Sequence, residues 1–176
     1  MKYELLIDDT ITFFGVQLFR IKALISFKGV KKGDVGGYVE SEKNLSQHGN
    51  AWVSGDAKVY GDAKVSGNAE VSGNAWVSGD AKVSGNAEVS GNAWVYGDAK
   101  VSGDADYIVF KNNWSSRRYF TYTKSNKKWK VGCFCGNSEE LIKKAYKDSK
   151  KSGDFYKAYV EFVEKLEAIE NGHKEQ

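Results

Sequence analysis

A six-residue repeat runs without interruption through the middle of the chain. From residue 51 the sequence reads AWVSGDAKVYGDAKVSGNAEVSGN and keeps this pattern to residue 106. Valine recurs at every sixth position over 53–101, alanine over 51–105, and glycine, always followed by Asn or Asp, over 55–103. So strict an internal period constrains the architecture before any other signal is considered.

Period six suits a triangular coil in which each hexapeptide supplies one short strand and one corner. Valine is β-branched and fills the interior, alanine occupies the crowded position near the corner, and glycine with Asn or Asp tolerates the corner backbone. Residues 75–92 repeat residues 57–74 with two exchanges, which indicates three hexapeptides per coil. Val35, Val39 and Leu45 extend the inward columns backwards, so we expect about four coils over 35–106.

The turns VSGNAE and VSGDAK resemble those of the hexapeptide-repeat left-handed β-helix family, except that Ser or Tyr follows the inward valine where glycine is commoner. The resemblance implies a left-handed parallel β-helix. We therefore expect a mainly β protein in three parts: an N-terminal β cap over 1–34, the β-helix over 35–106, and a C-terminal α+β module over 107–176.

The two ends lack the repeat and contain other structural signals. YELLI, ITFF and VQLFRIKALISF predict strands that cover the open end of the coil. YIVF, RRYFTYT and KWKVGCF predict three more, and Asn137 with Glu140 predicts a helix start. Gly153 is expected to break the helical region and Gly172 to end it. The predicted inner face of the last helix consists of Phe155, Tyr159, Phe162, Val163, Leu166 and Ile169.

Residues eighteen apart share a face, so the outward positions form columns. One face carries Trp76 and Trp94 beside Tyr60 and Tyr96, an aromatic set of the kind found at interfaces. This face predicts either a contact with another subunit or with the terminal segments, or else a site for an external partner. Lysine and glutamate columns on the other faces are either solvated surface or complementary faces of two copies. A homo-oligomer, dimer or trimer, is expected.

A second candidate site is a basic and aromatic segment, since residues 107–136 carry seven basic and no acidic side chains. Its candidate binding residues are Arg117, Arg118, Lys127, Lys128 and Trp129. Basic and aromatic side chains on a sheet bind nucleic acids or nucleotides by charge and stacking. The alternative is an ordinary solvated sheet, because half of the aromatic side chains must face the core.

The sequence contains few of the features that an enzyme of this fold would need. Acyltransferases of the hexapeptide family use a histidine base and often a loop leaving the coil, whereas here the repeat has no insertion and only His48 lies near its start. Cys133 and Cys135 lack metal-ligand partners. We expect no catalytic residue, metal or cofactor. Without a signal peptide or a membrane span, a cytoplasmic location is expected.

Three passages resemble a family of phage and prophage proteins. They are KKGDVGGYVE (31–40), GDADYIVF (103–110) and KVGCFCGNSEEL (130–141), where that family has KGDLGGWIE, DADYL and CGCF followed by a short helix. The cysteine passage of this chain differs from the family pattern, with CFC in place of CGCF. The resemblance implies an accessory protein without a particular activity. The leading hypothesis is a non-catalytic binding protein that inhibits a host process such as antiviral defence. The alternatives are a nucleic-acid or nucleotide binder and a self-assembling scaffold.

Overall fold

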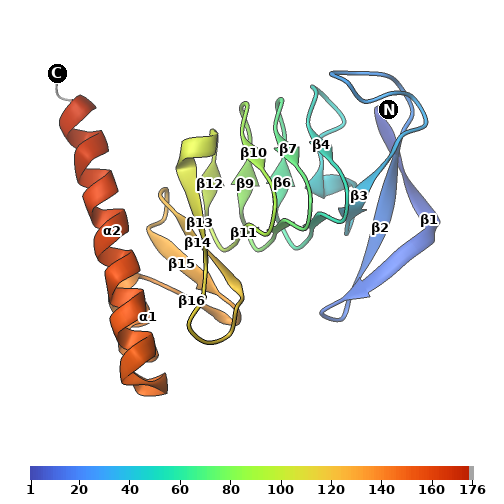
Figure 1. The fold of residues 1–176 in the computed structure, drawn as a ribbon. Coiled ribbons are helices and arrows are strands. Elements are labelled where there is room, and N and C mark those ends of the chain that lie inside the picture. The colour runs from blue at the N-terminus through green and yellow to red at the C-terminus, as the bar shows by residue number, and fades with distance from the viewer. Residues whose placement is uncertain (175–176) are drawn as a thin grey trace.

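The valine and alanine columns form the core of a parallel β-helix in the computed structural model, which describes residues 1–174. Every valine of the column over 53–101 and every alanine over 51–99 is almost completely buried. Four turns stack along one axis between an N-terminal β-hairpin and a C-terminal module (Figure 1). The predicted β-helix, β cap and α+β module are thus confirmed.

Three parallel sheets form the faces of the β-helix, and strands eighteen residues apart are paired, as Trp76 with Trp94. The first face consists of β3 (Val35–Val39), β5 (Lys58–Val59), β8 (Trp76–Val77) and β11 (Trp94–Val95). The second consists of β6 (Lys64–Val65), β9 (Lys82–Val83) and β12 (Lys100–Val101), and the third of β4 (Trp52–Val53), β7 (Glu70–Val71) and β10 (Glu88–Val89).

The first turn is longer than the others, which corrects the predicted phase. Val39 pairs with Val59 and Leu45 bridges to Val65, both twenty residues on, so this turn holds two extra residues. The short 3-10 helix η1 (Glu42–Asn44) lies at its corner. Val39 and Leu45 are buried as predicted, but Val35 is 52% exposed. The prediction for Val35 was wrong because it assumed an unbroken six-residue period.

Backbone hydrogen bonds join each turn to the next. The backbone N–H of Trp52 donates to the carbonyl of Ala69 (3.0 Å), and that of Trp76 to the carbonyl of Ala93 (2.9 Å). The strands pair in parallel, as Trp52 with Glu70, and a parallel ladder exchanges N–H and carbonyl groups in both directions. The first and the last turn are therefore each left with backbone groups that have no further turn to pair with, and these need partners.

The N-terminal segment covers the first turn of the β-helix. β1 (Tyr3–Phe13) and β2 (Val16–Ala23) form an antiparallel hairpin, and β2 pairs with β3 to extend the first face. Lys2 Nζ donates to the carbonyl of Ala51 and the Tyr3 hydroxyl to that of Leu45, both at 2.7 Å. The free carbonyls of the first turn thus gain side-chain donors.

Side chains of the C-terminal segment cover the last turn, and they both accept and donate, since the Tyr107 hydroxyl donates to the carbonyl of Glu88 at 2.8 Å. Side-chain oxygens from the 3-10 helix η2 (Asp104–Asp106) and from the following sheet lie over the last turn. The backbone N–H groups and their acceptors are Glu88 to Asp104 (2.7 Å), Trp94 to Thr121 (3.0 Å), Lys100 to Ser125 (2.8 Å) and Ser102 to Asp106 (2.6 Å). The module therefore takes the place of a fifth turn.

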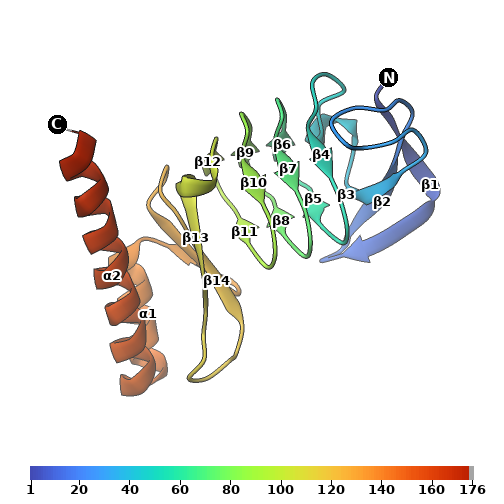
Figure 2. The same ribbon diagram turned by 45° about the horizontal axis from the view of Figure 1, so that its top comes forward.

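The C-terminal module is a four-stranded antiparallel sheet with two helices. The elements are β13 (Tyr107–Lys111), β14 (Tyr119–Thr123), β15 (Lys128–Val131), β16 (Phe134–Gly136), α1 (Ser138–Asp148) and α2 (Lys150–Lys174). The sheet lies between the β-helix and the helices (Figures 1 and 2). KWKVGCF was predicted as one strand, but Gly132 adopts a positive φ of 56° and turns the chain into two.

The helical region divides earlier than predicted. Asn137 and Glu140 form the predicted capping box, each side chain bonding to the other's backbone N–H at 2.9 Å. The break falls at Ser149, which is extended, whereas Gly153 lies inside α2. A Cβ at Gly153 would overlap the ring of Tyr146, so this glycine serves the close packing of α1 on α2. Gly172 does not end α2.

The inner face of α2 also differs from the prediction. Tyr156, Val160 and Val163 are buried, and their core includes Phe120 and Trp129 of the sheet. Phe155, Phe162 and Ile169 were assigned to this face and are instead exposed. Val163 and Tyr159 of the predicted face do pack in or against this core, so the arc that meets the sheet is shifted from the predicted one toward Tyr156 and Val160.

We predict that Thr121→Val destabilises the protein by about 1–3 kcal/mol, because the Trp94 N–H loses its acceptor while the side-chain volume is kept. Free energies of unfolding in urea measure the effect. Thr12→Val is the matched control on the exposed part of β1 and is expected to change stability by less than about 0.5 kcal/mol. Equal effects of the two substitutions would contradict the capping role.

We predict opposite effects for two glycine-to-alanine substitutions in α2. Gly172 has open space around it, so Gly172→Ala is expected to stabilise the helix by up to about 1 kcal/mol. Gly153→Ala gains the same helix propensity but displaces the Tyr146 ring. We therefore expect it to lower the stability of the protein by about 1 kcal/mol or more. Thermal unfolding compares them. A stabilising Gly153→Ala would show that the contact of α1 with α2 is not close.

Candidate functional site

Aromatic side chains gather on the first face of the β-helix. Trp76 and Trp94 are register partners on β8 and β11, and their rings lie 4.7 Å apart at 71°. Tyr96 follows two residues after Trp94, with a ring distance of 6.3 Å. The Trp94 indole N–H donates to the Ser78 hydroxyl at 3.4 Å. The structure thus places the predicted tryptophans and Tyr96 in one cluster.

The N-terminal hairpin adds two phenylalanines to this cluster. The Phe13 ring lies 4.7 Å from that of Trp76 and 5.8 Å from that of Tyr60, and the Phe14 ring lies 5.8 Å from Trp76. Packing against a terminal segment, one of the two contacts expected for this face, is therefore present. We call the following six residues the aromatic patch: Phe13, Phe14, Tyr60, Trp76, Trp94 and Tyr96.

Phe14 is the most unusual member of the aromatic patch. It precedes Gly15 in the tight turn between β1 and β2 and has a positive φ of 48°, a conformation that bulky residues rarely adopt. Its side chain is 71% exposed although it touches Trp76. Burial thus does not explain a phenylalanine at a position where glycine or asparagine costs less. Strain of this kind is found preferentially at functional sites.

Lys130 closes the other side of the aromatic patch. It lies on β15, is 8% exposed, and its Nζ is 4.0 Å from the Trp94 ring centroid and 4.4 Å from that of Tyr96. Burial lowers the pKa of Lys130, and this effect outweighs the nearby thiols of Cys135 and Cys133, which raise it. The sequence placed Lys130 in the basic segment but could not show which face it occupies.

Two more cations lie along the same sheet. The Arg20 guanidinium is 4.4 Å from the Tyr38 ring centroid, and Lys58 Nζ is 5.2 Å from that of Phe13. Burial is the largest influence on Lys58 and lowers its pKa, although the Asp56 carboxylate acts against it. Arg20 forms an ion pair with Asp9 at 3.3 Å and lies 3.9 Å from Asp56, so Lys58 and Lys130 are the lysines that border the aromatic patch on its two sides.

The predicted basic cluster is not brought together. Arg117 and Arg118 lie in the loop before β14, while Lys127 lies in the turn after it, so the length of the strand separates them. Lys128 forms an ion pair with Asp98 at 3.3 Å. Trp129 is completely buried between sheet and helices, so the prediction that it contacts a ligand was wrong. Alternation along β15 points it away from Lys128 and Lys130.

A small pocket of about 320 Å³ lies beside Arg118, where the sheet meets α1. Its lining includes Arg118, Lys144, Cys133 and Tyr156, together with the carboxylate of Asp148. The pocket thus presents two basic side chains and one acidic side chain to a small ligand.

Within residues 1–174, no group of three or more His, Cys, Asp or Glu side chains is placed to hold a metal ion. Cys133 is exposed, Cys135 is partly buried, and burial raises the pKa of the Cys135 thiol. No helix in this part of the chain is long and apolar enough to cross a membrane.

Comparison with known proteins supports the β-helix alone. The family model of the YdcK beta solenoid repeat matches residues 63–79 and 81–97. Both matches lie inside the hexapeptide repeat and leave the terminal segments uncovered. A search of curated proteins found no match. The chain therefore contains a β-solenoid repeat, and the aromatic patch lies partly on that repeat and partly on the unmatched ends.

We predict that Lys130 makes the stability of the protein depend on pH in the alkaline range. Its pKa is lowered in the folded chain, whereas in the unfolded chain it stays near 10.5. Between these values the unfolded chain binds more protons, so this group raises the free energy of unfolding as the pH increases. In Lys130→Met the free energy of unfolding should therefore rise less with pH than in the wild type. Lys127→Met, at an exposed turn, is the control and should leave the slope unchanged.

Proposed function

We propose that this chain is a non-catalytic binding protein whose aromatic patch contacts another protein. The observation that carries the proposal is Phe14, an exposed phenylalanine held in a strained turn against Trp76. Exposed aromatic side chains on a rigid support dominate the binding energy of many protein interfaces. The β-helix and the hairpin hold these rings in place before a partner arrives, which lowers the entropic cost of association.

The charges around the aromatic patch favour a partner with acidic groups beside an apolar surface. Lys58 and Lys130 border the rings, and each lies over an aromatic side chain of the patch. Acidic side chains at the rim of the partner would complement this border and speed association. The resemblance to phage and prophage proteins extends the proposal to a host protein, such as one of an antiviral defence, that is inhibited when this surface binds it.

A second candidate is an anionic ligand, such as a nucleotide, in the pocket beside Arg118. Arg118 and Lys144 provide the positive charge there, and Tyr156 provides an aromatic wall. This site uses Arg118 from the predicted basic segment, but the other residues that line it differ from the predicted set. Assembly of copies through the tryptophan columns is less favoured, because Phe13 and Phe14 already cover part of Trp76.

The test uses Phe14→Gly, since glycine adopts a positive φ without strain and the variant is expected to fold at least as well as the wild type. Proteins captured from a bacterial host extract are identified by mass spectrometry and then purified for affinity measurements. Phe14→Gly is expected to weaken binding at least about tenfold. Tyr119→Ser removes an exposed aromatic ring outside the patch and should leave affinity unchanged.

The outcomes separate the two candidates. Unchanged affinity in Phe14→Gly contradicts binding through the aromatic patch. Loss of binding in Arg118→Ala without loss in Phe14→Gly would favour the pocket, with nucleotide binding by calorimetry as the confirming measurement.

A further inference from the structure

Lys130 is the one buried polar side chain within residues 1–174 that has no hydrogen-bond partner. Its ammonium has the rings of Trp94 and Tyr96 beside it, with centroids 4.0 and 4.4 Å from Nζ. Each of the other buried polar side chains in this range forms a hydrogen bond. These side chains and their partners are Lys2 with Ala51, Asn44 with Gly61, Ser78 and Thr121 with Trp94, Asn112 with Ser115, and Thr123 with Asn126.

No carboxylate among the described residues neutralises Lys130. Burial lowers its pKa, and the groups that act against burial are the thiols of Cys135 and Cys133. Cys135 is the register partner of Lys130 on β16. Burial raises the pKa of the Cys135 thiol and outweighs the nearby lysines, so this thiol stays protonated near neutral pH and carries no negative charge. Lys128, on the same face of β15, is by contrast paired with Asp98.

Packing does not explain a lysine at position 130. Methionine would fill a similar volume beside the rings without removing a charge from water. A buried charge without a partner is costly, so a cation at this position indicates an acceptor that the chain itself does not supply. Every fully enclosed side-chain nitrogen or oxygen within residues 1–174 has a hydrogen-bond partner. The unpartnered ammonium of Lys130 therefore keeps contact with solvent, and an acceptor can reach it from outside.

The surroundings of Lys130 favour a single carboxylate as that acceptor. The rings of Trp94 and Tyr96 hold the ammonium by cation–π contacts and leave its solvent side for hydrogen bonds. One lysine matches one negative charge, whereas a phosphate group is best held by several donors. The next cation along the strand, Lys128, is already neutralised by Asp98. Apolar rings on both sides suit a carboxylate on a short apolar stem, as in glutamate or aspartate.

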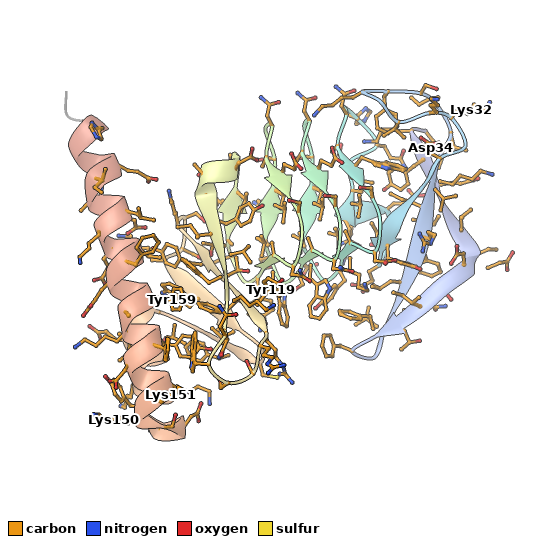
Figure 3. All side chains as sticks on the ribbon, in the orientation of Figure 1. Lys32, Asp34, Tyr119, Lys150, Lys151 and Tyr159 are labelled. Carbon is orange, nitrogen blue, oxygen red and sulfur yellow. The ribbon has the colours of Figure 1, made fainter. Side chains whose placement is uncertain are left out.

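We propose that Lys130 anchors the partner protein by accepting one of its acidic side chains, a glutamate or aspartate carboxylate that hydrogen-bonds to the ammonium beside Trp94 and Tyr96. The inference rests on the proposed function, because the carboxylate belongs to the protein that covers the aromatic patch. The ring of Trp76 contacts both Phe14 and Trp94, so one continuous surface joins the hairpin to Lys130. Side chains, rings among them, line the first face between the hairpin and the C-terminal sheet (Figure 3). The partner thus presents apolar groups to the rings and its acidic residue at the β15 end.

The first experiment tests the anchor without the partner. The probe is N-acetyl-glutamate methylamide, which carries one side-chain carboxylate, and NMR follows the indole N–H signal of Trp94 during a titration. The wild type and Lys128→Met should show a saturable shift, whereas Lys130→Met should show none. The uncharged N-acetyl-glutamine methylamide should cause no shift in any of them. No shift in the wild type, or the same shift in Lys130→Met or with the uncharged probe, overturns the proposal.

The second experiment measures the affinity for the protein captured from the host extract. Lys130→Met should bind at least about tenfold more weakly, since a buried carboxylate would lose its partner. Urea unfolding should show Lys130→Met to be folded. Lys130→Arg keeps the positive charge over the rings and should retain most of the affinity. Lys128→Met removes a cation from the same strand and is the matched control, with an expected change of less than about threefold.

The two proposals fail in different ways. If Phe14→Gly weakens binding and Lys130→Met does not, the anchor is wrong and the proposed function stands. If neither substitution changes the affinity, both are contradicted. Equal losses in Lys130→Met and Lys128→Met would show a general effect of positive charge and would also contradict the anchor.

Discussion

Each end of the β-helix leaves backbone N–H and carbonyl groups without a further turn to pair with, and the terminal segments have to supply their partners. Lys2 and Tyr3 donate to carbonyls of the first turn. Thr121 and Ser125 accept from N–H groups of the last turn, where the Tyr107 hydroxyl also donates to the carbonyl of Glu88. The repeat therefore depends on its non-repeating ends for hydrogen bonds that it cannot make by itself.

The same terminal segments assemble the aromatic patch. The hairpin that supplies Tyr3 to the first turn carries Phe14 at its other end, two turns further along the β-helix at Trp76. The sheet that supplies Thr121 to Trp94 also supplies Lys130 to the Trp94 ring. The same two segments thus cap the ends of the β-helix and form the candidate site. Weakening either end should disturb the rings even where no aromatic residue is changed.

The sequence predicts the parts of this structure that depend on local periodicity. The valine column and the pairing of Trp76 with Trp94 follow from the eighteen-residue repeat, since register in a β-helix is set by sequence spacing. Phe14 and Lys130 could not be placed on the same face, because their positions depend on how non-repeating ends fold over the repeat. The prediction for Val35 was wrong for a related reason, because two additional residues in the first turn change the register.

The error in α2 has a different physical origin. Helical periodicity locates apolar arcs, and it gives no information on which arc meets the chain's own sheet when there are two. Phe155 and Phe162 contact Trp114 and Phe110 on one side and stay exposed on the other, whereas the smaller Val160 and Val163 are buried. The core therefore takes the arc of α2 that fits the surface of the sheet, and the size of the apolar residues along the helix does not reveal which arc that is.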